Sequence, residues 1–469
     1  MSKNNDISRR DFLKKVGVGS AAVAGLSFAA CQSSDKNESE SNMPIPKGKM
    51  DYRVNPTSGD RVSLLGYGCM RWPTLPDTNG VIDQETVNRL VDFAIEHGVN
   101  YFDTSPAYCR GKSEESTGIA LARHPRDKYF IATKLSNFSP DTWSHEASVE
   151  MYHNSLRYLQ TDHIDYMLLH CIGQGATDKD GRRLDGMEAL HARFIDNGMI
   201  DYFMQEREAG RIRNLGFSYH GDIKVYDYLL SQHDKYKWDF VQIQLNYVDW
   251  KHAHELNSSN TNADYLYAEL EKRGIPAVIM EPLLGGRLAK LPSYTARLLK
   301  QERPEKSIAS WAFRFAGTLP NVLTVLSGMT YMEHLKDNLH QYCPFEPCSD
   351  KEIDLLHKIG DAYLRNDFVP CTACQYCMPC PHGIDIPGIF AHYNKCINEG
   401  NYDVNPQSEE YARARRAYLV GYDRSVPKLR QADHCIGCGK CVSHCPQTID
   451  IPAELHRIDR YVETLRQNP

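Results

Sequence analysis

The sequence contains no apolar run long enough to cross a membrane and no excess of basic charge. Its 469 residues carry a formal net charge of −6 that is spread along the chain, so composition offers no case for a nucleic-acid partner. The uncharged stretch Val16–Ala30 is rich in Gly and Ala, and it is too short and too weakly hydrophobic for a stable membrane span. We therefore expect no transmembrane span in the mature chain.

The N-terminal segment has the pattern of an export signal. Ser8–Lys14 reads Ser-Arg-Arg-Asp-Phe-Leu-Lys, which matches the twin-arginine motif, so residues 1–31 are predicted to be a signal peptide. Phe28–Cys31 resembles a bacterial lipoprotein cleavage site, and a lipid anchor at Cys31 is the alternative. Residues 32–59 are polar and predict a disordered tether. The expected location is the periplasm, or the outer side of the membrane if the chain is anchored.

Eight of the 15 cysteines fall into two short runs near the C-terminus, Cys371–Cys380 and Cys435–Cys445, each followed by proline. A C-x2-C-x2-C run lets three thiolates reach three irons of one cubic cluster, and in two-cluster ferredoxins the cysteine before proline binds the other cluster. Two structural zinc sites are the alternative, because C-x2-C pairs also suit zinc. The predicted ligands are Cys371, Cys374, Cys377 and Cys445 for one [4Fe–4S] cluster, and Cys435, Cys438, Cys441 and Cys380 for the other.

The middle of the chain, residues 60–342, alternates short apolar runs with helical patterns. The expected strands are Ser63–Cys69, Asn100–Thr104, Tyr129–Lys134, Ile164–His170, Arg213–Ser218, Phe240–Asn246, Ala277–Pro282 and Val322–Ser327. Eight such β-then-α units favour an α/β fold, a (β/α)8 TIM barrel. An open doubly wound sheet is the rival, but no G-x-G-x-x-G follows the first strand.

Polar residues stand at the carboxyl ends of three of these strands. Asp103 ends the second strand, Lys134 the third and His170 the fourth, and Tyr108 follows in the loop after Asp103. In a barrel these strand ends meet on one face around the mouth, where such enzymes place their chemistry. Each residue alone has a structural explanation, but together they predict an active site.

Several motifs in this region are similar to those of the aldo-keto reductase superfamily. They are Gly-Val-Asn-Tyr-Phe-Asp103-Thr-Ser-Pro-Ala-Tyr108, Ile-Ala-Thr-Lys134, Tyr-Met-Leu-Leu-His170, Gly210–Ser218 and Glu281–Gly286. With its cysteine-rich end, the whole chain resembles a branch of aldo-keto reductases that carry a ferredoxin domain. The resemblance implies hydride transfer between a nicotinamide and a carbonyl carbon, with a small carbonyl or alcohol as substrate.

The resemblance also implies a role for each of the four polar residues. Tyr108 would be the acid that protonates the carbonyl oxygen. Lys134 would lower the pKa of Tyr108, and Asp103 would hold Lys134 in place. His170 would polarise and orient the carbonyl oxygen as a hydrogen-bond donor.

The implied nucleotide groove matches the family less well than the four polar residues. The cofactor-binding positions carried over are Gly68, Met70, Ser218, Gln242, Ser327, Gly328, His334 and Asn338. The segment 327–334 has no Arg or Lys to clamp a 2′-phosphate, and His334 stands in the expected arginine position. NADPH, NADH and no dissociable nucleotide all stay open, as does a flavin, because a barrel mouth can bind one without a recognisable motif.

The C-terminal part, residues 368–469, predicts a small α-helical ferredoxin-like domain that resembles the iron–sulfur subunits of succinate dehydrogenase. Residues 343–367 predict a helical linker between the barrel and this domain. We expect an exported oxidoreductase whose carbonyl or alcohol chemistry is coupled to electron transfer through two [4Fe–4S] clusters, with a redox partner at the membrane. The alternative is an electron carrier whose barrel is a docking scaffold and whose clusters are structural.

Overall fold

The computed structural model describes residues 44–76, 78 and 80–468. The signal peptide, the cysteine at position 31 and the first part of the predicted tether lie outside these residues. No helix among the described residues is long and apolar enough to span a membrane.

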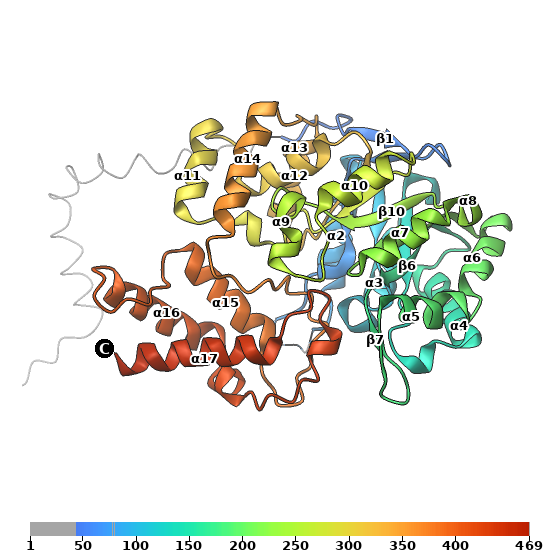
Figure 1. Cartoon of the computed structure of the whole chain (residues 1–469). Helices are drawn as coiled ribbons and strands as arrows, with labels where there is room; N and C mark the ends of the chain where they lie inside the picture. Colours follow the sequence, from blue (N-terminus) through green and yellow to red (C-terminus); the bar gives the residue numbers. More distant parts are fainter. Residues whose placement is uncertain (1–43, 77, 79, 469) are drawn as a thin grey trace, which may run out of the picture. The chain divides into compact units, whose positions relative to one another are not determined.

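Eight parallel strands close into a barrel, as the sequence predicted (Figure 1). They are β3 (Leu65–Gly68), β4 (Tyr101–Asp103), β5 (Phe130–Leu135), β6 (Ile164–Ile172), β9 (Ile212–Tyr219), β10 (Phe240–Gln244), β11 (Ala277–Met280) and β12 (Val322–Ser327). Each strand pairs with the next one around the barrel, and β12 pairs with β3 to close it. Every predicted strand is present, and the expected ends differ from the observed ones by at most a few residues.

Aromatic side chains fill the inside of the barrel. The Tyr166 ring packs against Tyr101 and Phe240 with centroid distances of 5.0 Å in both cases. All three side chains are fully buried. The barrel is therefore a packed core, and its chemistry is confined to the mouth.

Helices cover the outside of the barrel, because their apolar faces pack against the outward-facing strand residues. They are α2 (Gln84–Glu96), α3 (Ser113–Leu121), α4 (His145–Leu159), α5 (Gly186–Leu190), α6 (Met199–Glu208), α7 (Ile223–Ser231), α8 (His233–Tyr236), α9 (Asp249–Leu256), α10 (Ala263–Glu271), α11 (Ser293–Glu302), α12 (Ile308–Thr318) and α13 (Met332–Tyr342). Five of these twelve helices begin at a side-chain cap; for example, Ser144 accepts a hydrogen bond from the Ala147 N–H at the start of α4.

Ordered structure begins before the expected boundary at residue 60. The strand β1 (Tyr52–Val54) pairs antiparallel with β2 (Arg61–Ser63). Behind this hairpin, the Tyr166 hydroxyl donates a 3.1 Å hydrogen bond to Asp60 at the end of the barrel opposite the mouth. The predicted tether is therefore too long at its C-terminal end, because these residues have polar partners under the barrel. A second hairpin, β7 (Ala176–Thr177) with β8 (Arg183–Leu184), lies in the loop after β6.

The C-terminal part is helical and has its own apolar core. The helix α14 (Asp350–Tyr363) occupies the predicted linker, and it is followed by α15 (Ile386–Asn398), α16 (Tyr411–Ser425) and α17 (Ile451–Gln467). Residues such as Phe390, Tyr418 and Ile458 are buried between these three helices, separately from the barrel core.

Candidate active site and cysteine cavities

Asp103 and Lys134 form a buried ion pair at the barrel mouth. The Lys134 Nζ donates to Asp103 Oδ1 at 2.6 Å and to the Thr104 carbonyl at 2.8 Å. Both residues are almost fully buried, at 3 % and 1 % exposure. Burial raises the pKa of Asp103, and the charge of Lys134 opposes this shift. The pair is as the sequence predicted, and it places a positive charge under the mouth.

Tyr108 lies above this pair in the loop after β4. The Lys134 Nζ is 4.8 Å from the centroid of the Tyr108 ring, and this ring meets His170 edge-on at 5.9 Å. Burial raises the pKa of Tyr108 well above its ordinary value, and nearby acidic groups add to the shift. The loss of solvation is the largest cause of this shift, and the role implied for Lys134, to lower this pKa, stays a prediction. Tyr108 stays protonated and can donate a proton.

His170 is held as a neutral imidazole. The Ser136 hydroxyl lies 2.6 Å from His170 Nδ1, and Ser105 lies 3.4 Å from the same nitrogen. Burial and the charges of Lys134 and Arg193 lower the pKa of His170 well below its ordinary value. When the Ser136 hydroxyl donates to Nδ1, the ring proton is on Nε2, which makes Nε2 a hydrogen-bond donor.

Sequence reasoning missed the residues that position His170. Ser136 follows Lys134 by two residues, and side chains two residues apart in a strand point to the same face of the sheet. This spacing could have placed Ser136 beside Lys134 at the barrel mouth. Arg193 lies in the π-helical turn His191–Ile195 that continues α5, and it donates a 2.9 Å hydrogen bond to the His170 carbonyl. No motif marks Arg193, because its contact spans 23 residues of intervening chain.

Four cysteines from both runs surround one enclosed cavity in the C-terminal part. They are Cys371, Cys374, Cys377 and Cys445, and they line this cavity together with apolar side chains such as Ile386, Phe390 and Ile451. The Ala373 N–H donates to Cys371 Sγ at 3.3 Å, as backbone amides do around clusters. Burial raises the pKa of Cys374 to about 12, and the neighbouring thiolates of Cys371 and Cys445 contribute. Bare thiolates would repel one another here, so positively charged iron fits this donor set.

The other four cysteines also lie near one another. Burial raises the pKa of Cys441 to about 11, with contributions from Cys380, Cys435 and Cys438. In the described part of the chain, no group of three or more His, Cys, Asp or Glu side chains is arranged to hold one metal ion. Cys371, Cys374, Cys377 and Cys445 instead surround a space, which is typical of a cluster in which each thiolate binds a different iron.

Comparison with known proteins agrees with this geometry. The description Aldo/keto reductase family matches residues 64–361, which is more than half of the chain. The chain belongs to the aldo/keto reductase family. A second description, 4Fe-4S dicluster domain, matches residues 370–449 and covers both cysteine runs.

The relatives of this aldo/keto reductase match its barrel. The uncharacterized oxidoreductase YqkF of Bacillus subtilis is 26% identical over 337 residues, which are 66% of this chain and 96% of that protein. L-galactose dehydrogenase of Arabidopsis thaliana is 24% identical over 308 residues, 62% of this chain and 88% of that one. Among solved structures, the aldo-keto reductase AKR11C1 from Bacillus halodurans shares the fold, with a TM-score of 0.50, 24% identity and coverage of 66% of this chain and 96% of its own.

One of the predicted cofactor residues, Gln242, fits the amide end of a nicotinamide, whereas the Ser218 hydroxyl accepts a 3.0 Å hydrogen bond from the Cys171 N–H. Ser218 and Gln242 are register partners on β9 and β10. Gln242 Nε2 lies 3.4 Å from Asp103 Oδ2, whereas its buried Oε1 has no hydrogen-bond partner among the described residues. A nicotinamide carboxamide could supply the missing donor, so this end of the predicted groove fits the cofactor that the family uses.

The other predicted cofactor residues form the far end of this groove less completely. Gly68 lies against the backbone of Ser327 and Gly328, and the partly buried Met70 follows in the next turn. Asn338 Nδ2 donates to Ser327 Oγ at 2.8 Å, so these two side chains satisfy each other. His334 is exposed. The segment 327–334, all of it among the described residues, contains no Arg or Lys for a 2′-phosphate, and the Arg71 side chain packs against Gly328.

Proposed function

We propose that this aldo/keto reductase interconverts a small carbonyl compound and its alcohol, and that its chemistry is coupled to electron transfer through two [4Fe–4S] clusters. The observation that carries the proposal is the position of Tyr108 and His170 side by side above the buried Asp103–Lys134 pair.

The four residues can perform the acid–base part of this reaction. Reduction delivers a hydride to the carbonyl carbon and a proton from the Tyr108 hydroxyl to the oxygen, and oxidation of the alcohol reverses both transfers. His170 Nε2 would donate a hydrogen bond to the same oxygen as its negative charge develops. Lys134 lies close enough to stabilise the phenolate that remains on Tyr108. A nicotinamide bound at the mouth would supply or accept the hydride.

The finer parts of the proposal have separate support. The twin-arginine motif at Ser8–Lys14 supports export and an outer location, and Cys31 supports a lipid anchor. Two clusters that each carry one electron at a time support a redox partner at the membrane. The name L-galactose dehydrogenase of one relative supports sugars and their alcohols as a substrate class to test first.

Tyr108→Phe tests the proposal against an electron carrier with a scaffold barrel. Turnover of aldehydes, ketones and sugars would be measured with NADH, NADPH or reduced methyl viologen as donor. We expect kcat to fall by about 10²- to 10⁴-fold, with the visible absorbance of the clusters unchanged. Tyr247→Phe removes another buried phenol hydroxyl of the barrel and should keep full activity. A Tyr108→Phe protein with wild-type turnover would favour the carrier.

A further inference from the structure

The first cysteine run lies against the barrel mouth. The Arg71 guanidinium, in the turn after β3, donates hydrogen bonds to the carbonyl oxygens of Thr372 and Ala373. Gly285, in the loop after β11, has a φ of +68° and no room for a Cβ, because the Thr372 backbone occupies that space. Two loops of the mouth therefore hold the backbone of the run that supplies three of the four cavity cysteines.

The second run is also tied to the mouth. Gln447 Nε2 lies 3.5 Å from Gln244 Oε1 at the end of β10, and the Thr448 hydroxyl donates to Asn257 Oδ1 at 2.5 Å. The cavity lined by Cys371, Cys374, Cys377 and Cys445 is thus held against the mouth through both of its flanking segments.

Tyr376 belongs to the first cysteine run and extends from it toward Tyr108 and His170. Its ring packs against Phe138 at 6.1 Å, and Phe138 packs against His170 at 5.0 Å. The Arg193 guanidinium lies 5.3 Å from the Phe138 ring and holds this ring in place. A continuous aromatic wall, made of Tyr376, Phe138, His170 and Tyr108, therefore runs from the cysteine cavity to the predicted acid.

The electrostatics of Tyr376 are consistent with this position. Burial raises its pKa well above the ordinary value, with contributions from Cys171, Cys374 and Asp103. In turn, Tyr376 is among the groups that raise the pKa of Tyr108. Both hydroxyl groups thus share the low-dielectric mouth of the barrel.

We propose that Tyr376 is a substrate-contacting, specificity-determining residue of the barrel site, contributed by the loop between two cluster ligands. This inference rests on the proposed function. The Tyr376 and Phe138 rings form a wall beside the position where a carbonyl oxygen would meet Tyr108 and His170. The site should therefore take small carbonyl compounds or alcohols and reject those whose substituent needs the space of the Tyr376 ring.

The position of Tyr376 also has a consequence for the first cluster. Tyr376 directly precedes Cys377 and is two residues after Cys374, and both cysteines line the cavity. A molecule that contacts the ring should alter the packing of the backbone that carries these two ligands. Occupancy of the barrel should consequently change the electron paramagnetic resonance (EPR) spectrum of the cluster in this cavity.

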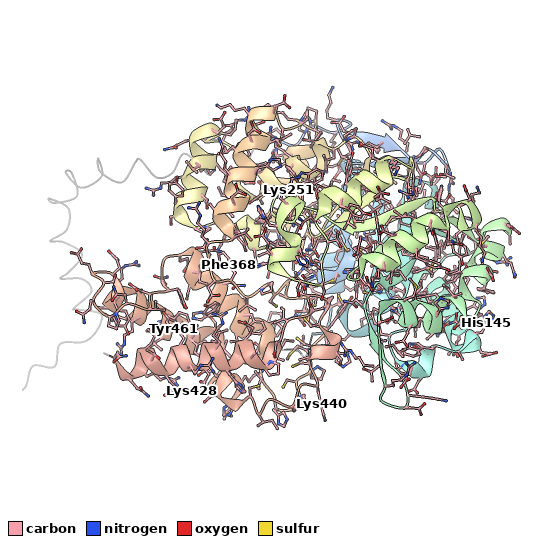
Figure 2. The ribbon with its side chains drawn as sticks, in the orientation of Figure 1. His145, Lys251, Phe368, Lys428, Lys440 and Tyr461 are labelled. Carbon is pink, nitrogen blue, oxygen red and sulfur yellow. The ribbon has the colours of Figure 1, made fainter. Side chains whose placement is uncertain are left out.

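The chain offers a matched control for this residue. Lys440 occupies the same place in the second run, between Cys438 and Cys441, but it is exposed on the C-terminal part (Figure 2). Lys440→Ala therefore alters the equivalent position of a cysteine run without altering the barrel mouth.

The experiment compares propanal with 2-naphthaldehyde as probes for the full chain, purified without oxygen. We expect Tyr376→Ala to raise the ratio of kcat/KM for 2-naphthaldehyde over propanal by about tenfold or more, because shape discrimination in an apolar pocket has this size. Tyr376→Phe and Lys440→Ala should leave the ratio within about threefold of wild type. An unchanged ratio in Tyr376→Ala with full iron content would overturn the inference.

A second measurement tests the inference if a Tyr376 variant loses its cluster, or if the wild-type protein turns over neither probe. Saturating propanal should change the EPR spectrum of the reduced wild-type protein and of Lys440→Ala, and the change should be smaller in Tyr376→Leu. No change in wild type, or an equal change in Tyr376→Leu, would overturn the inference. The result for Tyr108→Phe decides the proposed function separately, because that variant keeps the aromatic wall.

Discussion

The Ser136 hydroxyl lies 2.6 Å from His170 Nδ1, and the direction of this hydrogen bond decides which nitrogen of the imidazole carries the proton. A neutral imidazole has one proton for two nitrogens, so a donor at Nδ1 places the proton on Nε2. Because burial keeps His170 neutral, the tautomer rather than the charge decides whether it can donate to a substrate oxygen.

Ser136→Ala should therefore lower kcat by about tenfold or more, since the loss of one preformed donor to a developing oxyanion costs on this order. Ser136→Thr keeps the hydroxyl and should restore most of the activity. The pH profile of kcat should also change, because His170 loses a partner that favours one tautomer. Ser310→Ala, a buried serine of α12, is the control. If Ser136→Ala and Ser310→Ala have the same kcat, Ser136 has no positioning role.

The cysteine exchange between the two runs can be tested with double variants. Cys371→Ser with Cys445→Ser should lose one cluster, because both residues line the same cavity. Cys435→Ser with Cys445→Ser should lose both clusters, although both residues belong to the same run. Iron and acid-labile sulfide measured per chain would fall from about eight atoms to four in the first variant and close to zero in the second. The reverse pattern would mean that each run holds its own cluster.

Glu114 predicts a pH dependence of stability. It is 3 % exposed at the start of α3, and burial raises its pKa to about 7, although Thr133 donates a hydrogen bond to it. Its folded-state pKa lies above the unfolded value of 4.5, so its contribution to stability is fully present below that value and is lost as the pH rises through about 7. The loss by pH 8 is on the order of 3 kcal/mol.

Glu114→Gln should remove this dependence, because an amide keeps an acceptor for Thr133 and carries no charge. The free energy of unfolding, measured in urea at pH 5 and pH 8, should differ less in this variant than in wild type. Glu115→Gln changes an exposed carboxylate of the same helix and serves as the control. A Glu114→Gln protein with the wild-type difference would show that this carboxyl group does not govern the pH response.

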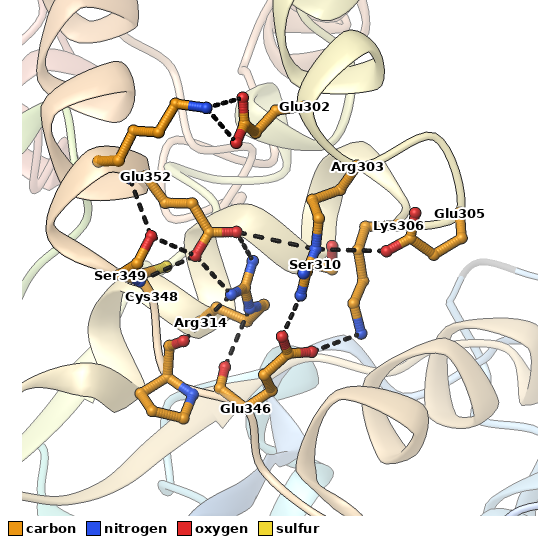
Figure 3. A network of polar contacts seen from close by, with 12 residues as sticks. Glu302, Arg303, Glu305, Lys306, Ser310, Arg314, Glu346, Cys348, Ser349 and Glu352 are labelled. Carbon is orange, nitrogen blue, oxygen red and sulfur yellow. Dashed lines mark hydrogen bonds and ion pairs between the residues drawn. The ribbon is translucent and has the colours of Figure 1, made fainter.

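Arg314 of α12 and Glu352 of α14 form a buried two-pronged ion pair (Figure 3). The two nitrogen–oxygen distances are 3.0 Å and 2.9 Å. Burial opposes ionisation of Glu352, but the hydrogen bonds from Arg314 and the Ser349 N–H lower its pKa to about 2. This pair ties the helix that precedes the cysteine domain to the barrel.

Glu352→Gln should destabilise the protein by about 3 kcal/mol, because it leaves the Arg314 charge buried without its partner. The double variant Arg314→Met/Glu352→Leu should lose less stability than the sum of the losses in Arg314→Met and Glu352→Leu, because neither charge then remains. Thermal and urea unfolding of wild type, these two single variants and the double variant would give the coupling. Lys351→Ala, which removes an exposed ion pair with Glu302, should change stability by less than about 1 kcal/mol. Additive effects of the two buried changes would contradict the coupling.

Local patterns were sufficient for much of this protein. Each strand of the barrel is a short apolar run between helical patterns, so the eight strands and the order of their connections could be predicted. Asp103, Lys134 and His170 could be placed together because parallel strands end on one face of a barrel. The spacing of the cysteines predicted iron–sulfur clusters, because the geometry of a short loop depends on the residues of the loop itself.

The protonation of the site residues and their hydrogen-bond partners could not be predicted from local patterns. The pKa of Tyr108 depends on how completely the folded mouth excludes water, and burial raises it well above its ordinary value. Ser136 and Arg193 had no motif, because their role exists only through contacts with His170.

The sequence by itself determined the barrel, the four polar residues of its mouth and the two cysteine runs, because each depends on periodicity or spacing within short segments. Only the tertiary structure decided that the first cysteine run lies on the mouth and that Tyr376 reaches Phe138. The physical reason is that these contacts join residues more than 200 positions apart, through the packing of the helical part against the barrel loops.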